Sequence, residues 1–151
     1  MSSISFAGQN VLIAEDEVII AYDLAQAFEN AGATVTTSHS LDAALAAVRS
    51  SKFDTAVIDV KLKADLSGPL CALLQCMNVP FVIYTGCADI SGFKYKTCII
   101  QKPAAFEEIA AKLERISERK KETVRKVRVP KPSRRVERMS KMTPSLAKQT
   151  S

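Results

Sequence analysis

One stretch constrains this chain more than any other: the run Thr55–Val60, in which apolar residues lead directly into the carboxylate of Asp59. A short run rich in Val and Ile and bounded by polar residues is typical of a buried strand. Because the run is apolar on both faces, it predicts a central strand of a parallel sheet. Asp59 then lies at the carboxyl end of that strand, where open α/β sheets bind ligands. The alternative is a loop carboxylate that only caps the following helix.

Four further runs have the character of strands, and helical patterns separate most of them. The predicted strands cover residues 10–14, 33–37, 55–60, 81–85 and 97–101. Helices are predicted from the acidic segment at 15–17 to about Ala31, after an N-cap at Ser40, from Pro69 through Met77, and from Phe106 to Ile116. The alternation predicts an α/β fold with five βα units, a doubly wound parallel sheet of flavodoxin-like strand order 2-1-3-4-5 and right-handed crossovers.

Two connections depart from this regular alternation. Residues 60–68, after the third strand, are polar and predict a loop. Residues 87–96, between the fourth and fifth strands, have only a weak helical pattern and contain the pair Ser91-Gly92. Gly32 stands where a left-handed helix C-cap belongs.

Polar residues stand at each strand end that would border the crevice between the first and third strands. Each has an ordinary explanation: an acidic helix start for Glu15 and Asp16, a strand residue or N-cap for Thr85, and a surface lysine for Lys102. In the predicted strand order, however, the carboxyl ends of these strands meet in one crevice. The sequence therefore predicts that these side chains cluster with Asp59.

Such a cluster suits phosphoryl transfer to a carboxylate. Carboxylates that lie close together repel, and a divalent cation with hard oxygen ligands, such as Mg²⁺, removes that cost. Lys102 adds a second positive charge, while the Thr85 hydroxyl and the Gly86 backbone N–H can bond phosphoryl oxygens. Asp59, at the floor of the crevice, is the predicted nucleophile. The sequence contains no P-loop pattern.

Over about residues 9–117 the chain resembles the receiver (CheY-like) domain of two-component response regulators. The matching segments are Val11–Glu17, Ala56–Val60, Tyr84–Gly86 and Lys102-Pro103. The resemblance implies that Asp59 is the phosphoacceptor, Thr85 the switch hydroxyl and Lys102 a phosphoryl contact. It also implies an Mg²⁺ site whose ligands are Asp16, with Glu15 as its acidic neighbour, Asp59 and the Lys61 backbone carbonyl. The Lys102–Pro103 bond looks like the family's cis peptide.

The sequence departs from the usual receiver pattern near the fifth strand. Ile99 stands three residues before Lys102, where receivers usually carry a switch aromatic, so Tyr84 becomes the candidate for that role. Pro80-Phe81 followed by Thr85-Gly86 is similar to a variant group of stand-alone receivers with a Pro-Phe-x-Phe-Ala-Thr-Gly-Tyr motif, although Cys87 replaces the final Tyr. The span from Thr85 to Lys102 is short, which predicts a truncated, remodelled or mobile fourth helix.

Composition limits the setting in which the chain works. With 151 residues it can form one domain and an appendage. The sequence has no run apolar and long enough to span a membrane, and residues 1–10 lack the features of a signal peptide, so we expect a cytoplasmic protein without membrane contact. The spacing of the four cysteines does not suit a zinc site, and we expect them to be small buried hydrophobic residues.

Charge is segregated along the chain. Residues 1–116 hold 9 Lys/Arg and 13 Asp/Glu, for a net −4, whereas residues 117–151 hold 12 and 3, for a net +9. This predicts a receiver domain over residues 9–117 and a basic, partly disordered tail over 118–151. We expect a tail that serves solubility or is prone to degradation, or one that contacts nucleic acid or an acidic partner weakly and without sequence preference.

Together these features predict a single-domain response regulator. A histidine kinase or phosphotransfer protein would phosphorylate Asp59, and the change in conformational population would alter binding of an output partner. No enzymatic activity is expected beyond self-phosphorylation from small donors and autodephosphorylation. The alternatives are a binding module that works unphosphorylated and a phosphate sink that drains a kinase.

Overall fold

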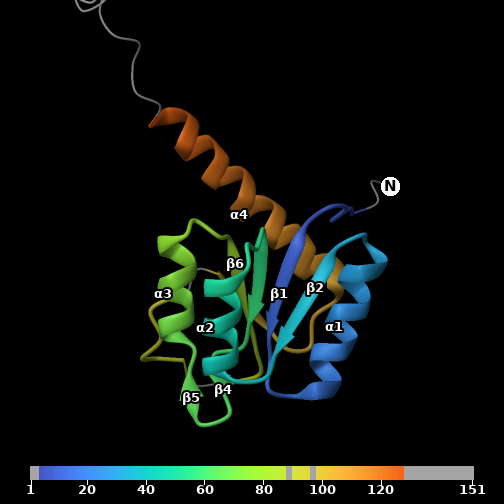
Figure 1. The fold of residues 1–151 in the computed structure, drawn as a ribbon, viewed down its shortest axis with the longest axis vertical. Helices are drawn as coiled ribbons and strands as arrows, with labels where there is room; N and C mark the ends of the chain where they lie inside the picture. The colour runs from blue at the N-terminus through green and yellow to red at the C-terminus, as the bar shows by residue number, and fades with distance from the viewer. Residues whose placement is uncertain (1–3, 88–89, 96–97, 128–151) are drawn as a thin grey trace, which may run out of the picture. The chain divides into compact units, whose positions relative to one another are not determined.

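A five-stranded parallel sheet forms the centre of the fold (Figure 1). The computed structural model describes residues 4–87, 90–95 and 98–127. The strand order is β2-β1-β3-β6-β7, which for these five strands is the predicted 2-1-3-4-5 order. The strands are β1 (Asn10–Ala14), β2 (Thr34–Ser38), β3 (Thr55–Ile58), β6 (Phe81–Thr85) and β7 (Ile99–Gln101). β3 ends at Ile58, so Asp59 follows the strand directly.

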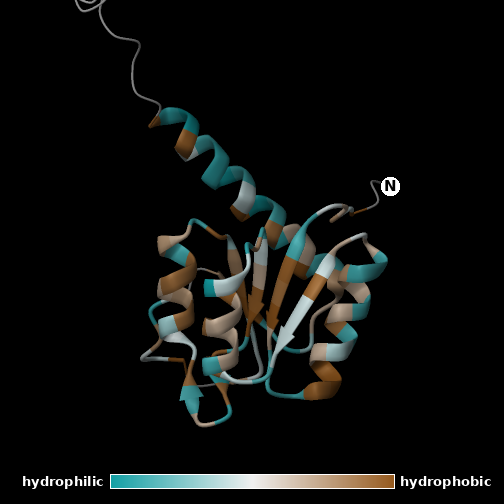
Figure 2. Cartoon of the chain, in the orientation of Figure 1, coloured by the Kyte–Doolittle hydropathy of each residue, from teal (hydrophilic) through white to brown (hydrophobic). Residues whose placement is uncertain are grey.

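Helices cover both faces of this sheet, as the doubly wound prediction requires. They are α1 (Val18–Asn30), α2 (Leu41–Ser50), α3 (Gly68–Cys76) and α4 (Phe106–Lys126). Buried side chains of α1 and of the first half of α4 pack with alternate residues of the strands in one cluster, and those of α2 and α3 form the other. The central strands are apolar along their length (Figure 2) because both of their faces are covered.

Local sequence signals set the helix ends. The Ser40 hydroxyl accepts a hydrogen bond from the Ala43 N–H at 3.2 Å, which makes it the predicted N-cap of α2. Gly32, after α1, has φ +97°, and a Cβ there would lie 3.0 Å from the Ala7 Cα. Both the left-handed backbone and the close approach of Ala7 require glycine at this position.

The connection after β3 is not the plain polar loop that the sequence predicted. It forms a β-hairpin in which β4 (Lys61–Leu62) pairs antiparallel with β5 (Asp65–Leu66). The Leu62 side chain is fully buried in the α2–α3 core cluster, and the Ser67 N–H donates to the Val60 carbonyl at 2.8 Å. Two-residue strands are too short for a periodic pattern, so the hairpin could not be recognised from hydropathy.

The described residues of the connection after β6 contain no α-helix, in line with the predicted truncation or remodelling, and only Cys98 has 3₁₀ geometry. Instead, the Phe93 and Tyr95 rings pack edge to face at a centroid distance of 5.6 Å, and Tyr95 packs against Phe81 of β6 at 5.8 Å. Phe93 is 93% buried even though it lies outside any helix or strand. Side-chain packing therefore holds this segment against the sheet.

The described residues include no helix that is both long enough and apolar enough to cross a membrane. The chain divides into two units, with the boundary between Lys121 and Glu122. In the described part of the second unit, Lys126 forms an ion pair with Glu122 at 3.0 Å. The predicted disorder and nucleic-acid contact of the tail concern mainly residues 128–151, which lie outside the described residues.

The cysteine prediction is correct for Cys71, which is buried, and wrong for Cys76 and Cys87, which are exposed. Cys71 and Cys76 lie on the same helix, α3, and only Cys71 faces the core. Cys87 follows the end of β6, where the chain returns to the surface.

Candidate functional site

The carboxyl ends of four neighbouring strands meet at one edge of the sheet. Backbone hydrogen bonds continue the pairing beyond the strands: the Asp59 N–H donates to the Ala14 carbonyl, and the Lys102 N–H donates to the Thr85 carbonyl, both at 2.9 Å. The parallel register therefore places Glu15, Asp59, Thr85 and Lys102 side by side, each one residue beyond or at the end of its strand.

Three carboxylates, those of Glu15, Asp16 and Asp59, lie together at this edge and form the acidic cluster, with Lys102 beside them. Each carboxylate has an oxygen within 4.8 Å of oxygens on the other two. The Lys102 Nζ lies 2.6 Å from Glu15 Oε2 and 2.9 Å from Asp59 Oδ2. These two hydrogen bonds join Lys102 to residues that are 87 and 43 positions away in the sequence. Lys102 is therefore a part of this site and not an ordinary surface lysine.

Burial and the positive charge of Lys102 together shift the pKa values in this group. Burial raises the pKa of Glu15 to about 7; the hydrogen bond from Lys102 opposes the rise, and the charge of Asp59 adds to it. Burial also works to lower the pKa of Lys102, but its hydrogen bonds to Glu15 and Asp59 outweigh burial and raise it. Lys102 therefore stays charged and holds the two carboxylates together.

Asp16 is held by the backbone of the β4–β5 hairpin and not by Lys102. Its Oδ2 accepts a hydrogen bond of 2.9 Å from the backbone N–H of Lys63 in the β4–β5 hairpin. Burial works to raise the pKa of Asp16, but this hydrogen bond and the neighbouring side chain of Glu15 outweigh burial and lower it. Asp16 therefore carries its charge more readily than Glu15, whose pKa is raised.

Thr85 and Gly86 lie beside this group. The Thr85 side chain is buried, and its Oγ1 accepts the N–H of Cys87 at 3.1 Å, which leaves the hydroxyl proton available to another acceptor. A Cβ on Gly86 would lie 3.8 Å from the Lys102 side chain, so the Gly86 backbone borders the lysine.

Comparisons with known proteins were made by sequence and by structure. No protein-family model matches the chain, and no curated protein matches it. Solved structures do match. A CheY-like receiver domain protein from Methanospirillum hungatei is 20% identical, with a TM-score of 0.68 over 76% of this chain and 98% of that one. The Thermotoga maritima response regulator TrrA, in complex with Mg²⁺ and BeF, is 15% identical, with a TM-score of 0.63 over 72% and 98%.

A third structure is a response regulator from Burkholderia pseudomallei with a phosphorylated aspartic acid, a calcium ion and citrate. It is 27% identical, with a TM-score of 0.63 over 80% of this chain and 76% of that one. The chain has the fold of a response regulator receiver domain. The site described above lies at the sheet edge where the receiver resemblance had predicted it.

Tyr84 is the aromatic residue that this receiver fold places next to Thr85. It is buried on the α1–α4 side of the sheet, and its hydroxyl oxygen accepts the N–H of Ala104 at 3.2 Å. The Lys102 Nζ lies 5.5 Å from the centre of its ring. The Lys102–Pro103 peptide is cis, as expected. Tyr84 therefore contacts the chain on both sides of this peptide, which suits the switch role predicted for it.

The donor chemistry of the receiver's acidic cluster fits Mg²⁺. If all three carboxylates are ionised, they carry −3, and the single ammonium of Lys102 leaves −2, the charge that a divalent cation balances. Carboxylate oxygens are also the hard ligands that Mg²⁺ prefers. Asp16 and Asp59, with Glu15 beside them, would hold the ion. Lys61 follows Val60 as the first residue of β4, and the role of its carbonyl as a ligand stays a prediction.

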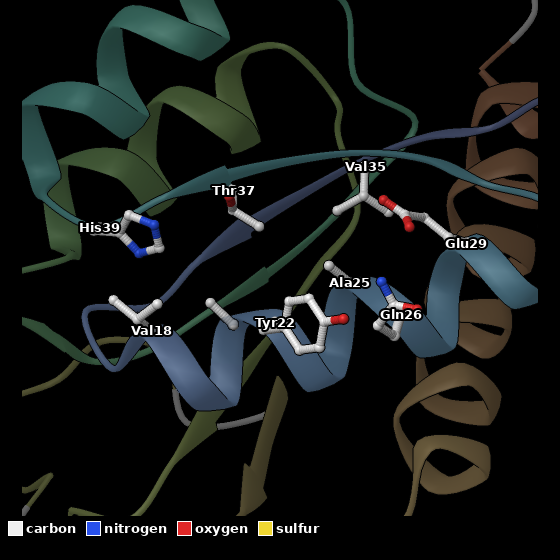
Figure 3. A pocket seen from close by; sticks show the side chains of 9 residues that line it. Val18, Tyr22, Ala25, Gln26, Glu29, Val35, Thr37 and His39 are labelled. Atoms are coloured by element: carbon white, nitrogen blue, oxygen red, sulfur yellow. The ribbon is translucent and has the colours of Figure 1, made fainter.

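Sequence reasoning missed two contacts of the receiver site. The Lys63 backbone contact with Asp16 had no signal in the sequence, because a backbone N–H is the same in every residue. His39 was also missed: its Nδ1 lies 2.9 Å from the Glu15 carbonyl. His39 lines a hollow of about 260 Å³ between α1 and β2, with Val18 and Tyr22 (Figure 3). This hollow is not lined by the acidic cluster, so we do not assign the phosphoryl chemistry to it.

Proposed function

We propose that this chain is a response regulator receiver that accepts a phosphoryl group on Asp59 from a histidine kinase or a phosphotransfer protein. One observation carries the proposal: Lys102 bridges Asp59 and Glu15 within a cluster of three carboxylates, at the carboxyl edge of a receiver-type sheet. A structural ion pair needs one carboxylate for each lysine. Here Lys102 pairs with two carboxylates and a third, Asp16, lies close to both, which leaves an excess of negative charge that destabilises the fold unless a cation binds.

The reaction requires a carboxylate nucleophile in line with the donor. An Asp59 oxygen forms a bond to phosphorus as the P–N bond of a phosphohistidine breaks, and the donor imidazole leaves with its electron pair and takes up a proton. Mg²⁺, when bound, neutralises charge on the carboxylates and on the phosphoryl oxygens. Asp59 is largely buried, with 9% of its surface exposed, and a donor would have to reach it through that exposed part.

The neighbours of Asp59 have distinct tasks in this proposal. Lys102 supplies a positive charge to the phosphoryl oxygens, and its raised pKa keeps that charge at physiological pH. Thr85 and the Gly86 N–H donate hydrogen bonds to the same oxygens. Tyr84, next to Thr85, moves with it and changes the packing on the α1–α4 side of the sheet. The result is a shift in conformational population that changes partner binding, with no catalysis on a foreign substrate.

The phosphoryl donor needs a surface beside this crevice. The first turns of α1 begin three residues after Glu15 and expose three large apolar side chains, Val18, Ile19 and Tyr22. Exposed apolar side chains grouped next to an active site are typical of partner contacts. This surface supports a protein donor, although small phosphoryl donors can also reach Asp59.

The test uses the intact protein and its mass. Incubation with acetyl phosphate or phosphoramidate should add one phosphoryl group to the wild type in the presence of Mg²⁺ and none in EDTA. Asp59→Asn is nearly isosteric but lacks the nucleophilic carboxylate, so it should stay unlabelled. Asp65→Asn, an exposed carboxylate on β5, is the matched control and should label like the wild type. Equal labelling of Asp59→Asn would disprove the assignment.

The same material separates the alternatives. A phosphate sink would show rapid loss of the label and no partner whose binding depends on it. A binding module that works unphosphorylated would bind its partner equally well as the wild type and as Asp59→Asn.

A further inference from the structure

Lys63 has an unusual backbone conformation for a residue with a side chain. Its φ is +58°, in the left-handed region, and Asn78 is the only other non-glycine residue with a positive φ in the described part of the chain, at +57°. Asparagine is one of the few residue types that adopt this region readily, whereas lysine is not. Unfavourable backbone conformations of this kind persist where the surrounding structure enforces them, often at functional sites.

The hairpin enforces the conformation of Lys63. The pairs Lys61–Leu66 and Leu62–Asp65 leave only Lys63 and Ala64 as a two-residue loop. The commonest turns in loops of this length have a positive φ at the first loop position, because their twist matches that of the two strands. The buried Leu62 side chain and the Ser67–Val60 hydrogen bond fix both ends of the hairpin to the core. Lys63 therefore cannot change its backbone direction without disturbing this hairpin.

The enforced backbone directs its N–H at the acidic cluster. The Lys63 N–H donates to Asp16 Oδ2 at 2.9 Å, across 47 positions of sequence. The contact uses only the backbone, and the Lys63 side chain is exposed. A carboxylate has two oxygens with several acceptor positions, so this bond orients Asp16 and leaves acceptor capacity for another partner.

We propose that Lys63 is a positioning residue for the metal site: its left-handed backbone places an N–H that orients the Asp16 carboxylate toward Mg²⁺. This rests on the proposed function, because it assumes that Mg²⁺ binds at the acidic cluster. Groups that orient a metal ligand from the second layer typically contribute about 10–100-fold to metal affinity. The β4–β5 hairpin then belongs to the site, although it carries no side chain that contacts the carboxylates in the described structure.

The experiment compares two valine substitutions at matched backbone positions in the full-length protein. Valine strongly disfavours a positive φ, so both substitutions penalise the left-handed backbone, and the penalty in Asn78→Val is at least as large because asparagine tolerates this region better than lysine. Only Lys63 lies next to Asp16. Isothermal titration calorimetry with Mg²⁺ should show affinity at least fivefold weaker for Lys63→Val and within twofold of wild type for Asn78→Val. Lys63→Gly keeps the N–H and permits the conformation, so its affinity should equal or exceed that of the wild type.

Loss of the positive charge of Lys63 cannot explain a weaker Mg²⁺ affinity in Lys63→Val. Removing a lysine near a cation site would raise Mg²⁺ affinity, so a loss in Lys63→Val comes from the backbone, and Lys63→Gly controls for the missing charge. A metal-free measurement adds independent support: Asp16→Ala should speed hydrogen exchange at the Lys63 amide about tenfold. Wild-type Mg²⁺ affinity in a folded Lys63→Val, or unchanged exchange in Asp16→Ala, would overturn the positioning role. Absence of Mg²⁺ binding to the wild type would overturn the proposed function as well.

Discussion

The connection after β3 and the connection after β6 both follow strands whose carboxyl ends carry site residues, but different forces hold them. The first is a hydrogen-bonded hairpin whose loop donates a backbone N–H to Asp16. The second has no α-helix or strand in its described residues, and aromatic packing of Phe93 and Tyr95 holds it. Polar contacts require a defined direction, whereas aromatic packing tolerates small shifts, so the two connections suit different tasks.

The two connections therefore suit different roles at the site. The hairpin presents a fixed group to a fixed carboxylate, which favours a metal site that is preorganised. The connection after β6 begins at Gly86, directly after Thr85, and both residues belong to the groups that we propose contact a phosphoryl group on Asp59. A segment held by a few rings can reorganise at lower cost than one held by a closed hydrogen-bonded ladder. We therefore expect perturbations of the two connections to have separable effects.

The largest expected effect comes from removing the main aromatic anchor. Phe93→Ala should lower the free energy of unfolding by about 3 kcal/mol, because it removes a 93% buried ring and leaves a cavity. Urea denaturation measures this. Mg²⁺ affinity should change less than twofold, because the hydrogen bond that orients Asp16 comes from Lys63 in the other connection. Leu66→Ala, an exposed apolar residue on the hairpin, is the control and should cost at most about 0.5 kcal/mol. A large loss of Mg²⁺ affinity in Phe93→Ala would break the proposed separation.

A second prediction uses pH to change the charge of Glu15 in the acidic cluster. Glu15 has a pKa of about 7 in the fold against 4.5 unfolded, so the folded state retains a proton that the unfolded state releases. In EDTA, stability should therefore fall as pH rises from about 4.5 to 7, by up to about 3 kcal/mol, and then level off. Glu15→Gln cannot titrate and should lose this slope. Urea denaturation at several pH values measures both proteins, and identical pH profiles would contradict the prediction.

The smallest effect concerns the residue between the two connections. Tyr84→Phe removes the hydroxyl that accepts the Ala104 N–H and should cost about 1 kcal/mol of stability. If Tyr84 is the switch aromatic, Tyr84→Phe should also alter how Mg²⁺ and beryllofluoride change amide exchange at Gly86 and Cys87, while labelling of Asp59 stays near wild type. Tyr95→Phe, on the aromatic anchor, is the matched control. An unchanged exchange response in Tyr84→Phe would exclude the switch role of its hydroxyl.

Much of the site could be predicted from the order of the elements. A parallel sheet places all its carboxyl ends at known edges, so Glu15, Asp59, Thr85 and Lys102 could be brought together from their positions after apolar runs. The strand boundaries were accurate to about two residues because Val, Ile and Leu mark buried strands directly. The weak pattern over 87–96 predicted a truncated, remodelled or mobile fourth helix, and the described residues of this segment, 87 and 90–95, contain no α-helix.

What the sequence determined by itself is therefore local or follows from chain order: the strands, the helix caps at Ser40 and Gly32, and the set of polar strand ends. Only the tertiary structure decided which oxygen each donor reaches, such as the bridge of Lys102 between Glu15 and Asp59 and the Lys63 N–H on Asp16. It also decided that Cys71 is buried while Cys76, on the same helix, is exposed. The physical reason is range: capping and periodicity depend on neighbours within about four residues, whereas these contacts join segments more than 40 residues apart and depend on how the packed core orients them.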